Sequence, residues 1–274
     1  MENFPKPIGI FDSGVGGLSV LREIRAQMPA QPVIYYGDQA RVPYGVRTLE
    51  EVRTFAHQIT AYLLDQGAGL IVVACNAASA AALHALRQSY PVVPFVGMEP
   101  AVKPAAETTR TGVVGVLATP ATFQGKLYAS VVERFAGNVE LLQSTCPGLV
   151  QQIEMGHLDG LETRHILEQA LQPMLARRID TVVLGCTHYP FVIPVIQAIV
   201  GPGVRVIDPA PAVARQASRL LAASGLANPA TGSGCVQYFT SGEAAQFESR
   251  LMEWLGEKGK ATQVEWTREL SIQI

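Results

Sequence analysis

Short, almost wholly apolar runs alternate with longer amphipathic stretches along the chain of 274 residues. Runs such as IGIFD at 8–12, LIVVA at 70–74 and TVVLG at 181–185 are typical of parallel strands that are buried on both faces. The stretches between them have the spacing of amphipathic helices. This alternation predicts an α/β fold with mainly parallel sheets and right-handed crossovers.

The apolar runs and the helical spacing between them give the positions of the expected strands and helices. We expect strands at 8–12, 33–37, 70–74, 93–97, 112–117, 139–142, 181–185, 204–207 and 236–240. We expect helices near 17–28, 49–66, 77–88, 120–135, 161–177, 190–199, 210–223 and 243–256. Thr48 and Glu51 form a capping box at one helix start, and Thr119 is an N-cap that precedes a proline at another.

A weak internal repeat runs through these elements. VVACNAAS at 72–79 returns as VVLGCTHY at 182–189, with the two cysteines 111 positions apart. IGIFDSGVGG at 8–17 has a fainter counterpart in VGVLATPATF at 114–123, at an offset of 107. Two similar offsets indicate two related α/β units of ordinary domain size, with a chance coincidence of short patterns as the alternative.

The repeat and the last strand together suggest a division of the chain. We expect two pseudo-symmetric α/β domains, with an active site at the interface between them. Residues 1–98 and 209–274 are expected to form the first domain, because the final strand and helix would complete its sheet. Residues 99–208 are expected to form the second domain.

Composition excludes several classes of protein. Hydrophobic residues make up 48% and charged residues 16% of the chain, against roughly a quarter charged in average globular proteins. The net charge of −2 predicts neither a nucleic-acid partner nor a membrane surface as partner. The start, MENFPKPIGIFD, lacks the features of a secretion signal, and the apolar runs are too short to span a bilayer. We therefore expect a cytoplasmic protein.

Four scattered cysteines, with no CxxC pair, predict neither disulfides nor a zinc knuckle. No HExxH or similar spacing predicts a metal site. The glycine turn at 14–17 does not complete a GxGxxG dinucleotide fingerprint. The few lysines and the absence of a P-loop disfavour pyridoxal phosphate, so the expectation is catalysis without a cofactor.

Two of the cysteines occupy matching positions in the repeat. Cys75 and Cys186 each stand just past a predicted parallel strand and just before a helix start. Ligands bind at such strand ends, and a helix N-terminus favours a thiolate. A single buried cysteine is usually a packing residue, but two in equivalent places are hard to explain in that way.

Two opposed thiols suit the inversion of a carbon centre. One thiolate removes a proton and the opposite thiol delivers one to the other face, which is racemisation or epimerisation. Asp12 at its strand end and His188 beside Cys186 are candidates for tuning the two thiols. The turn of Pro43, Tyr44 and Gly45 is a candidate for presenting backbone groups and a phenol to a ligand, with a plain turn as the alternative.

Five motifs in order resemble glutamate racemase: FDSGVGG, GDQARVPYG, CNAAS, CPGLVQQIE and GCTHYP, between residues 11 and 190. The resemblance implies interconversion of L- and D-glutamate without cofactor, for bacterial peptidoglycan, and commonly a homodimer. It places the catalytic thiols on Cys75, which would act on the D-enantiomer, and Cys186, which would act on the L-enantiomer. Asp12 would assist the first thiol, and Glu154 with His188 the second.

The same resemblance implies a set of substrate contacts. These are Asp12, Ser13, Tyr44, Gly45, Asn76, Ala77, Thr119, Thr122, Thr187 and His188. One position departs from the family pattern, which usually has threonine where this chain has Ala77. The missing hydroxyl removes one hydrogen bond to the substrate carboxylate, worth about 1 kcal/mol.

Three other functions stay open on sequence alone. An isomerase for aspartate or another α-substituted acid would use the same scaffold. A dinucleotide- or flavin-dependent oxidoreductase would share the doubly wound pattern. A two-domain binding protein for dicarboxylates would need no chemistry from the thiols.

Overall fold

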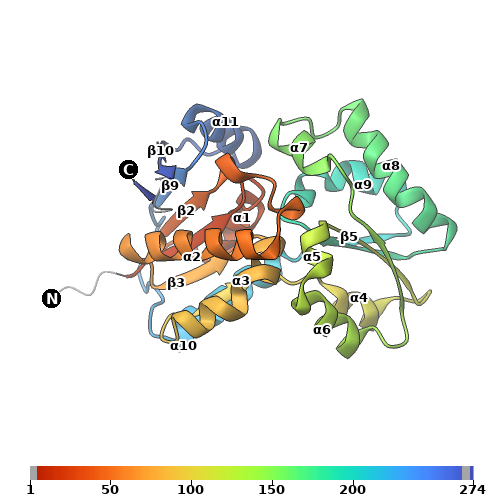
Figure 1. Ribbon diagram of the computed structural model, residues 1–274, viewed down its shortest axis with the longest axis horizontal. Helices are drawn as coiled ribbons and strands as arrows, with labels where there is room; N and C mark the ends of the chain where they lie inside the picture. The colour runs from red at the N-terminus through yellow and green to blue at the C-terminus, as the bar shows by residue number, and fades with distance from the viewer. Residues whose placement is uncertain (1–4, 267–271, 274) are drawn as a thin grey trace.

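The computed structural model describes residues 5–266 and 272–273, which form two α/β domains that lie side by side (Figure 1). Every strand expected from the sequence is present, with ends within two residues of those expected. The predicted α/β fold with mainly parallel sheets is therefore confirmed. Among the described residues, no helix is both long and apolar enough to cross a membrane.

The first sheet is parallel throughout and has the order β10-β9-β2-β1-β3-β4. Its strands are β1 (Ile8–Asp12), β2 (Val33–Gly37), β3 (Leu70–Val73), β4 (Phe95–Gly97), β9 (Val236–Thr240) and β10 (Ala261–Gln263). The last two come from the part of the chain that follows the second sheet, and β9 pairs with β2 while β10 pairs with β9. This arrangement supports the proposed domain division, whose boundaries at 98 and 208 stay a prediction.

The second sheet is also parallel and has the order β6-β5-β7-β8. Its strands are β5 (Val113–Ala118), β6 (Glu140–Ser144), β7 (Thr181–Gly185) and β8 (Arg205–Ile207). A short antiparallel pair, β11 (Glu265–Trp266) and β12 (Ile272–Gln273), lies outside both sheets. It was not expected, because two-residue strands have no readable period.

Helices cover both faces of each sheet. They are α1 (Leu18–Gln27), α2 (Leu49–Asp65), α3 (Asn76–Ser89), α4 (Val102–Thr108), α5 (Pro120–Gln124), α6 (Lys126–Phe135), α7 (Leu149–Glu154), α8 (Leu161–Ala176), α9 (Ile193–Val200), α10 (Ala210–Ala223) and α11 (Ala244–Leu255). The short helices α4 and α7 were not expected, since each is too brief to show a helical period. The helix expected near 190–199 begins as a 3₁₀ turn at Tyr189–Val192.

The helix expected over 120–135 is wrong in one respect, because it is two helices. The backbone at Gly125 is extended, and α5 ends and α6 begins there. A Cβ atom at Gly125 would collide with Ala80 of α3, so the break lies where the two domains touch. Contact with the other domain has overridden local helical propensity.

Alternate residues of the central strands β1 and β7 enter different cores, which explains their unbroken apolar runs. In β1, Ile8 and Ile10 pack towards α1, α10 and α11, whereas Phe11 packs towards α2 and α3. In β7, Val182 and Leu184 face α7, α8 and α9, and Val183 faces the core that includes α4 and α6. Strands buried on both faces need apolar residues at every position.

The end of the chain is packed firmly onto the first domain and touches the second. Phe247 of α11 is fully buried, with its ring centroid 5.7 Å from that of Tyr35 and 5.9 Å from that of Tyr238. Trp254, at the end of the same helix, stacks on Phe191 of the second domain at 4.2 Å between centroids. The last helix therefore helps to hold the domains together.

Replacing Phe247 by alanine should destabilise the fold, because it leaves a cavity between α11 and the first sheet. We expect Phe247→Ala to lower the free energy of unfolding by about 3–5 kcal/mol, measured by denaturant unfolding. Leu161→Ala is the control, since Leu161 is 90% exposed and should cost within about 0.5 kcal/mol. Equal losses for the two variants would contradict this account of α11.

Candidate active site

The carboxyl ends of four strands meet where the domains touch. Asp12 ends β1 and Cys75 lies just beyond β3, in the first sheet. Thr119 and Cys186 directly follow β5 and β7 in the second sheet. Parallel sheets place ligands at such ends, and here two sheets present theirs to one space.

That space is a small cavity of about 20 Å³ between the domains. Ten of its lining residues were expected from the sequence, and they are Ser13, Tyr44, Gly45, Cys75, Asn76, Ala77, Thr119, Cys186, Thr187 and His188. Pro43, the first residue of the candidate turn, also lines it, whereas Val150 and Gly185 were not singled out. The expected residues that do not line it are Asp12, Thr122 and Glu154, which contact residues that do.

Cys75 is the N-cap of α3. Its sulfur accepts a hydrogen bond from the backbone N–H of Ala78 at 3.4 Å, and its thiol donates to the Ser13 hydroxyl at 3.9 Å. Burial raises the pKa of the Cys75 thiol, and the negative charge of Asp12 raises it further. Burial and the charge of Asp12 therefore both disfavour the thiolate form of Cys75.

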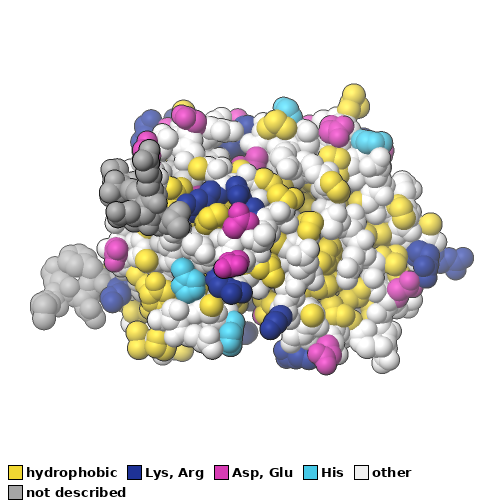
Figure 2. Space-filling view, viewed as in Figure 1, with side chains coloured by type: hydrophobic (Ala, Val, Ile, Leu, Met, Phe, Trp, Pro, Cys, Tyr) yellow, Lys and Arg dark blue, Asp and Glu magenta, His cyan; other side chains and the backbone are white. Residues whose placement is uncertain are grey.

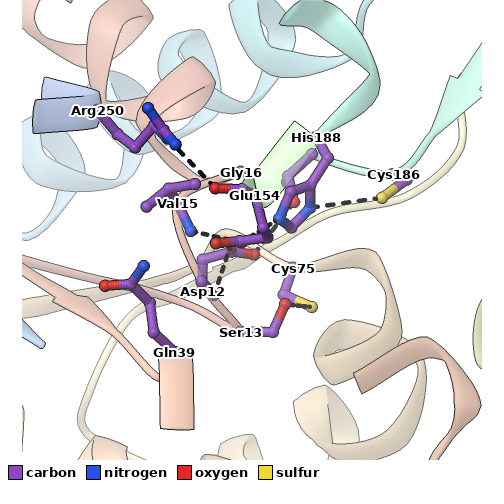
Figure 3. A network of polar contacts seen from close by, with 12 residues as sticks. Asp12, Ser13, Val15, Gly16, Gln39, Cys75, Glu154, Cys186, His188 and Arg250 are labelled. Atoms are coloured by element: carbon purple, nitrogen blue, oxygen red, sulfur yellow. Dashed lines mark hydrogen bonds and ion pairs between the residues drawn. The ribbon is translucent and has the colours of Figure 1, made fainter. Parts of the chain in front are cut away.

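Cys186 has different surroundings. Its sulfur lies 3.7 Å from Nδ1 of His188, and Nε2 of His188 lies 2.6 Å from a carboxylate oxygen of Glu154 (Figure 3). Burial lowers the pKa of His188, but hydrogen bonds to Cys186 and Glu154 outweigh it, and the pKa stands well above its usual value. The resulting imidazolium stabilises negative charge on the adjacent sulfur.

The glycine turn after β1 contacts Glu154 and His188 of the second domain. The backbone N–H of Val15 donates to Oε1 of Glu154 at 2.9 Å. A Cβ atom at Gly14 would collide with the Glu154 carboxylate, and one at Gly16 would collide with the His188 ring. The turn is therefore more than a tight connection, because its glycines make room for the second domain.

Asp12 bridges the domains. Its carboxylate accepts a hydrogen bond from the Thr187 hydroxyl at 3.1 Å and another from the Gly14 N–H at 3.1 Å. Burial raises the pKa of Asp12, and the positive charge of His188 opposes that shift. The thiol of Cys75 instead contacts Ser13 and Ala78, so direct assistance by Asp12 to that thiol stays a prediction.

Other lining groups offer hydrogen bonds to a small polar ligand. The side-chain amide of Asn76 is buried, and neither of its polar atoms has a partner among the described residues. Thr119 lies 3.1 Å from Thr122, oxygen to oxygen, so Thr122 supports it from behind. The hydroxyl of Tyr44 is bonded to Asp38, outside the cavity lining, which leaves its ring and backbone for the site.

Several residues that hold the site were missed by the sequence analysis. The Ser19 hydroxyl donates to the carbonyl of Thr187 at 2.9 Å, which joins α1 to the second domain. Arg250 of α11 donates to the carbonyl oxygen of Glu154 at 3.2 Å (Figure 3). These contacts join residues far apart in the chain, so no local pattern signals them.

Charge on the visible face and metal-binding capacity among the described residues bear on which partners the protein could take. Basic and acidic side chains are interspersed on the face shown in Figure 2, and no extended basic field lies there. Among the residues placed by the structure, no group of three or more His, Cys, Asp and Glu side chains is arranged to hold a metal ion.

Comparison with known proteins identifies the family. The model of the Asp/Glu/Hydantoin racemase family matches residues 8–217. The chain is 50% identical over 247 residues to a glutamate racemase from a Roseiflexus species, covering 90% of this chain and 91% of the relative.

Solved structures agree with this match. A glutamate racemase from Escherichia coli, in complex with L-glutamate and the activator UDP-MurNAc-Ala, has a TM-score of 0.83 and 31% identity, covering 98% of this chain and 100% of that one. One from Francisella tularensis, in complex with D-glutamate, has a TM-score of 0.82 and 29% identity, covering 94% and 96%. The chain belongs to the Asp/Glu/hydantoin racemase family and, within it, to the glutamate racemases.

Proposed function

We propose that this enzyme interconverts L- and D-glutamate without a cofactor, with Cys75 and Cys186 as its two bases. The observation that carries the proposal is that the two buried thiols reach one cavity from different domains. The bound L- and D-glutamate of the E. coli and F. tularensis relatives support glutamate as the substrate. No equivalent observation favours aspartate, a flavin or simple dicarboxylate binding.

The proton transfers balance without any other reagent. With L-glutamate, the thiolate of Cys186 takes the α-proton, so a C–H bond breaks and an S–H bond forms. The thiol of Cys75 then gives its proton to the opposite face of the carbanion. The products are D-glutamate, a Cys186 thiol and a Cys75 thiolate, which is the state that D-glutamate needs for the reverse reaction.

The electrostatics of the site suit this order of events. The raised pKa of His188 places a positive charge beside the Cys186 sulfur, and burial raises the pKa of the Cys75 thiol. Because an α-proton beside a carboxylate is only weakly acidic, the developing negative charge needs preorganised donors. Asn76, Thr119, Thr187 and the backbone at the start of α3 are the candidates to supply them.

Substrate entry requires the domains to separate. A cavity of about 20 Å³ is close to the least space that holds one water molecule, which is far less than glutamate needs. Closing around the substrate would exclude water and set the thiols on opposite sides of the α-carbon.

The resemblance also supplies a setting for the reaction. We place the enzyme in the cytoplasm as a source of D-glutamate for peptidoglycan, and as a homodimer. Light scattering of the purified protein tests the dimer, and a monomer at micromolar concentration would exclude it. Restoration of growth in a bacterium that requires added D-glutamate tests the role in the cell.

Removing either thiol should strongly slow racemisation. We expect Cys75→Ala and Cys186→Ala each to lower kcat by about 10²–10⁴-fold, because each loses one proton-transfer group. In heavy water, Cys75→Ala should still exchange the α-proton of L-glutamate, and Cys186→Ala that of D-glutamate. NMR of the α-position and optical rotation measure the two effects.

Cys235→Ala is the matched control, since Cys235 is exposed and is not among the residues that line the cavity, and it should keep full activity. Racemisation above a tenth of the wild-type rate in either single variant would end the two-thiol proposal. Faster turnover of L-aspartate than of L-glutamate by the wild type would end the proposed substrate.

The charged His188 should make stability depend on pH. Its pKa is higher in the folded than in the unfolded protein, so its contribution is complete below about pH 6.5 and is lost as pH rises through the folded value. We expect the difference in unfolding free energy between wild type and His188→Gln to shrink as pH rises from 6 to 10. Urea unfolding across that range measures it, and a constant difference would contradict a charged His188.

Ala77 should limit affinity for glutamate. Restoring the family's hydroxyl with Ala77→Thr should lower KM by about fivefold, corresponding to about 1 kcal/mol from one hydrogen bond. Ala77→Val is the matched control, because it has the same shape without the hydroxyl. If the two variants have the same KM, the backbone or a neighbour already satisfies the carboxylate.

A further inference from the structure

Asp38 is a buried carboxylate that the proposed chemistry does not use. It directly follows β2, is fully shielded from solvent, and does not line the cavity. Its backbone N–H donates to the carbonyl oxygen of Asp12 at 3.0 Å, so it lies beside the end of β1. A buried carboxylate is stable only where donors replace its lost hydration, and its donors therefore show what it holds.

Within the part of the chain that the structure describes, three side chains donate to this carboxylate. The Tyr44 hydroxyl bonds one oxygen, while the Ser241 hydroxyl at 2.6 Å and the Trp266 indole N–H at 2.8 Å bond the other. The Arg41 guanidinium lies 3.9 Å from the first oxygen. Ser241 and Trp266 lie 203 and 228 positions beyond Asp38, in the segment that follows β9.

The same segment fastens the backbone around Asp38. The N–H of Ser241 donates to the carbonyl of Gly37 at 3.1 Å, and the Ser241 hydroxyl accepts from the N–H of Ala40 at 3.1 Å. The Thr240 hydroxyl donates to the side chain of Gln39 at 2.8 Å. The loop is therefore tied to the end of the chain at several points.

Aromatic contacts complete this attachment. The Arg41 guanidinium lies 3.4 Å from the centroid of the Trp266 ring and 4.1 Å from that of Phe55. Such a stacked guanidinium over aromatic faces adds cation–π attraction to the hydrogen bonds. Trp266 thus contacts the loop through both its N–H and its ring.

The other end of the loop forms a wall of the cavity. Pro43, Tyr44 and Gly45 all line it, and Tyr44 is almost completely buried. A Cβ atom at Gly45 would collide with Thr119 of the second domain, so this wall is also a contact between the domains. A shift of Tyr44 would change both the cavity and the fit of the domains.

We propose that Asp38 is a positioning residue. Ser241 and Trp266 hold its carboxylate in place, and the carboxylate in turn fixes Tyr44, which forms part of the cavity wall that would contact the substrate. Its catalytic consequence rests on the proposed function. Ser241 and Trp266 lie beyond residues 8–217, which the family model matches. The segment that contains Ser241 and Trp266 therefore positions one wall of a binding site whose other residues come from the strand-end motifs.

A double-mutant cycle tests whether Asp38 acts through Tyr44. Asp38→Asn and Tyr44→Phe should each raise the KM for L-glutamate about tenfold with a smaller change in kcat. In the Tyr44→Phe background, Asp38→Asn should add less than twofold, because the hydrogen bond is already absent. Independent, multiplying effects would show that Asp38 only stabilises the fold and would overturn the proposal.

Amide hydrogen exchange tests the attachment without relying on turnover. In Trp266→Phe, which loses the N–H donor and keeps an aromatic ring, and in Ser241→Ala, amides of residues 38–46 should exchange at least tenfold faster than in wild type. Ser249→Ala is the matched control, since its exposed hydroxyl donates to Glu253 on the same helix, α11. Unchanged exchange in both variants would overturn the proposal even if the wild type racemises glutamate. Faster exchange in a protein inactive on glutamate would uphold the attachment and reject the proposed function.

Discussion

The charged pair of Glu154 and His188 from one domain, seated on the glycine turn of the other, is the contact on which the site depends. His188 contacts the sulfur of Cys186, and Glu154 accepts a hydrogen bond from the turn that follows β1. The pair therefore links the strand ends of the two sheets. A buried ion pair is costly unless its remaining hydrogen-bonding capacity is met, and the Val15 N–H contributes to meeting it. The contact between the domains therefore also supplies a hydrogen-bond donor to this buried pair.

The two thiols occupy equivalent places in related folds, yet their environments differ. Cys75 has a helix start and a hydroxyl beside it, whereas Cys186 has an imidazolium. The two enantiomers have equal free energies, so catalytic efficiency must be the same in both directions whatever the protein does. Under the proposed mechanism, each enantiomer needs a different protonation state of the two thiols. The unequal environments determine which of these two states the free enzyme favours.

Features carried by short local patterns were predictable from the sequence. The apolar runs predicted the strands because both faces of each sheet are covered, and the repeated cysteine motif pointed to both thiols. The break at Gly125 and the pairing of Glu154 with Val15 were not predictable, because each is decided by a surface from the other domain. The partners of Asp38 were missed for the same reason, since Ser241 and Trp266 come from the far end of the chain. The candidate reactive residues of this protein are therefore found in local motifs, whereas the residues that position them are distant in the sequence.

The strand order of the first sheet also affects how the protein is made. β9 and β10 are synthesised after the other strands of this sheet, but β9 pairs with β2, one of the first strands to leave the ribosome. Until residue 236 has emerged, one side of β2 has unpaired backbone groups, which favour pairing with another chain. The second domain, whose strands are contiguous, can finish folding before the first. A nascent chain halted before β9 thus carries a finished second half beside a first half prone to aggregation.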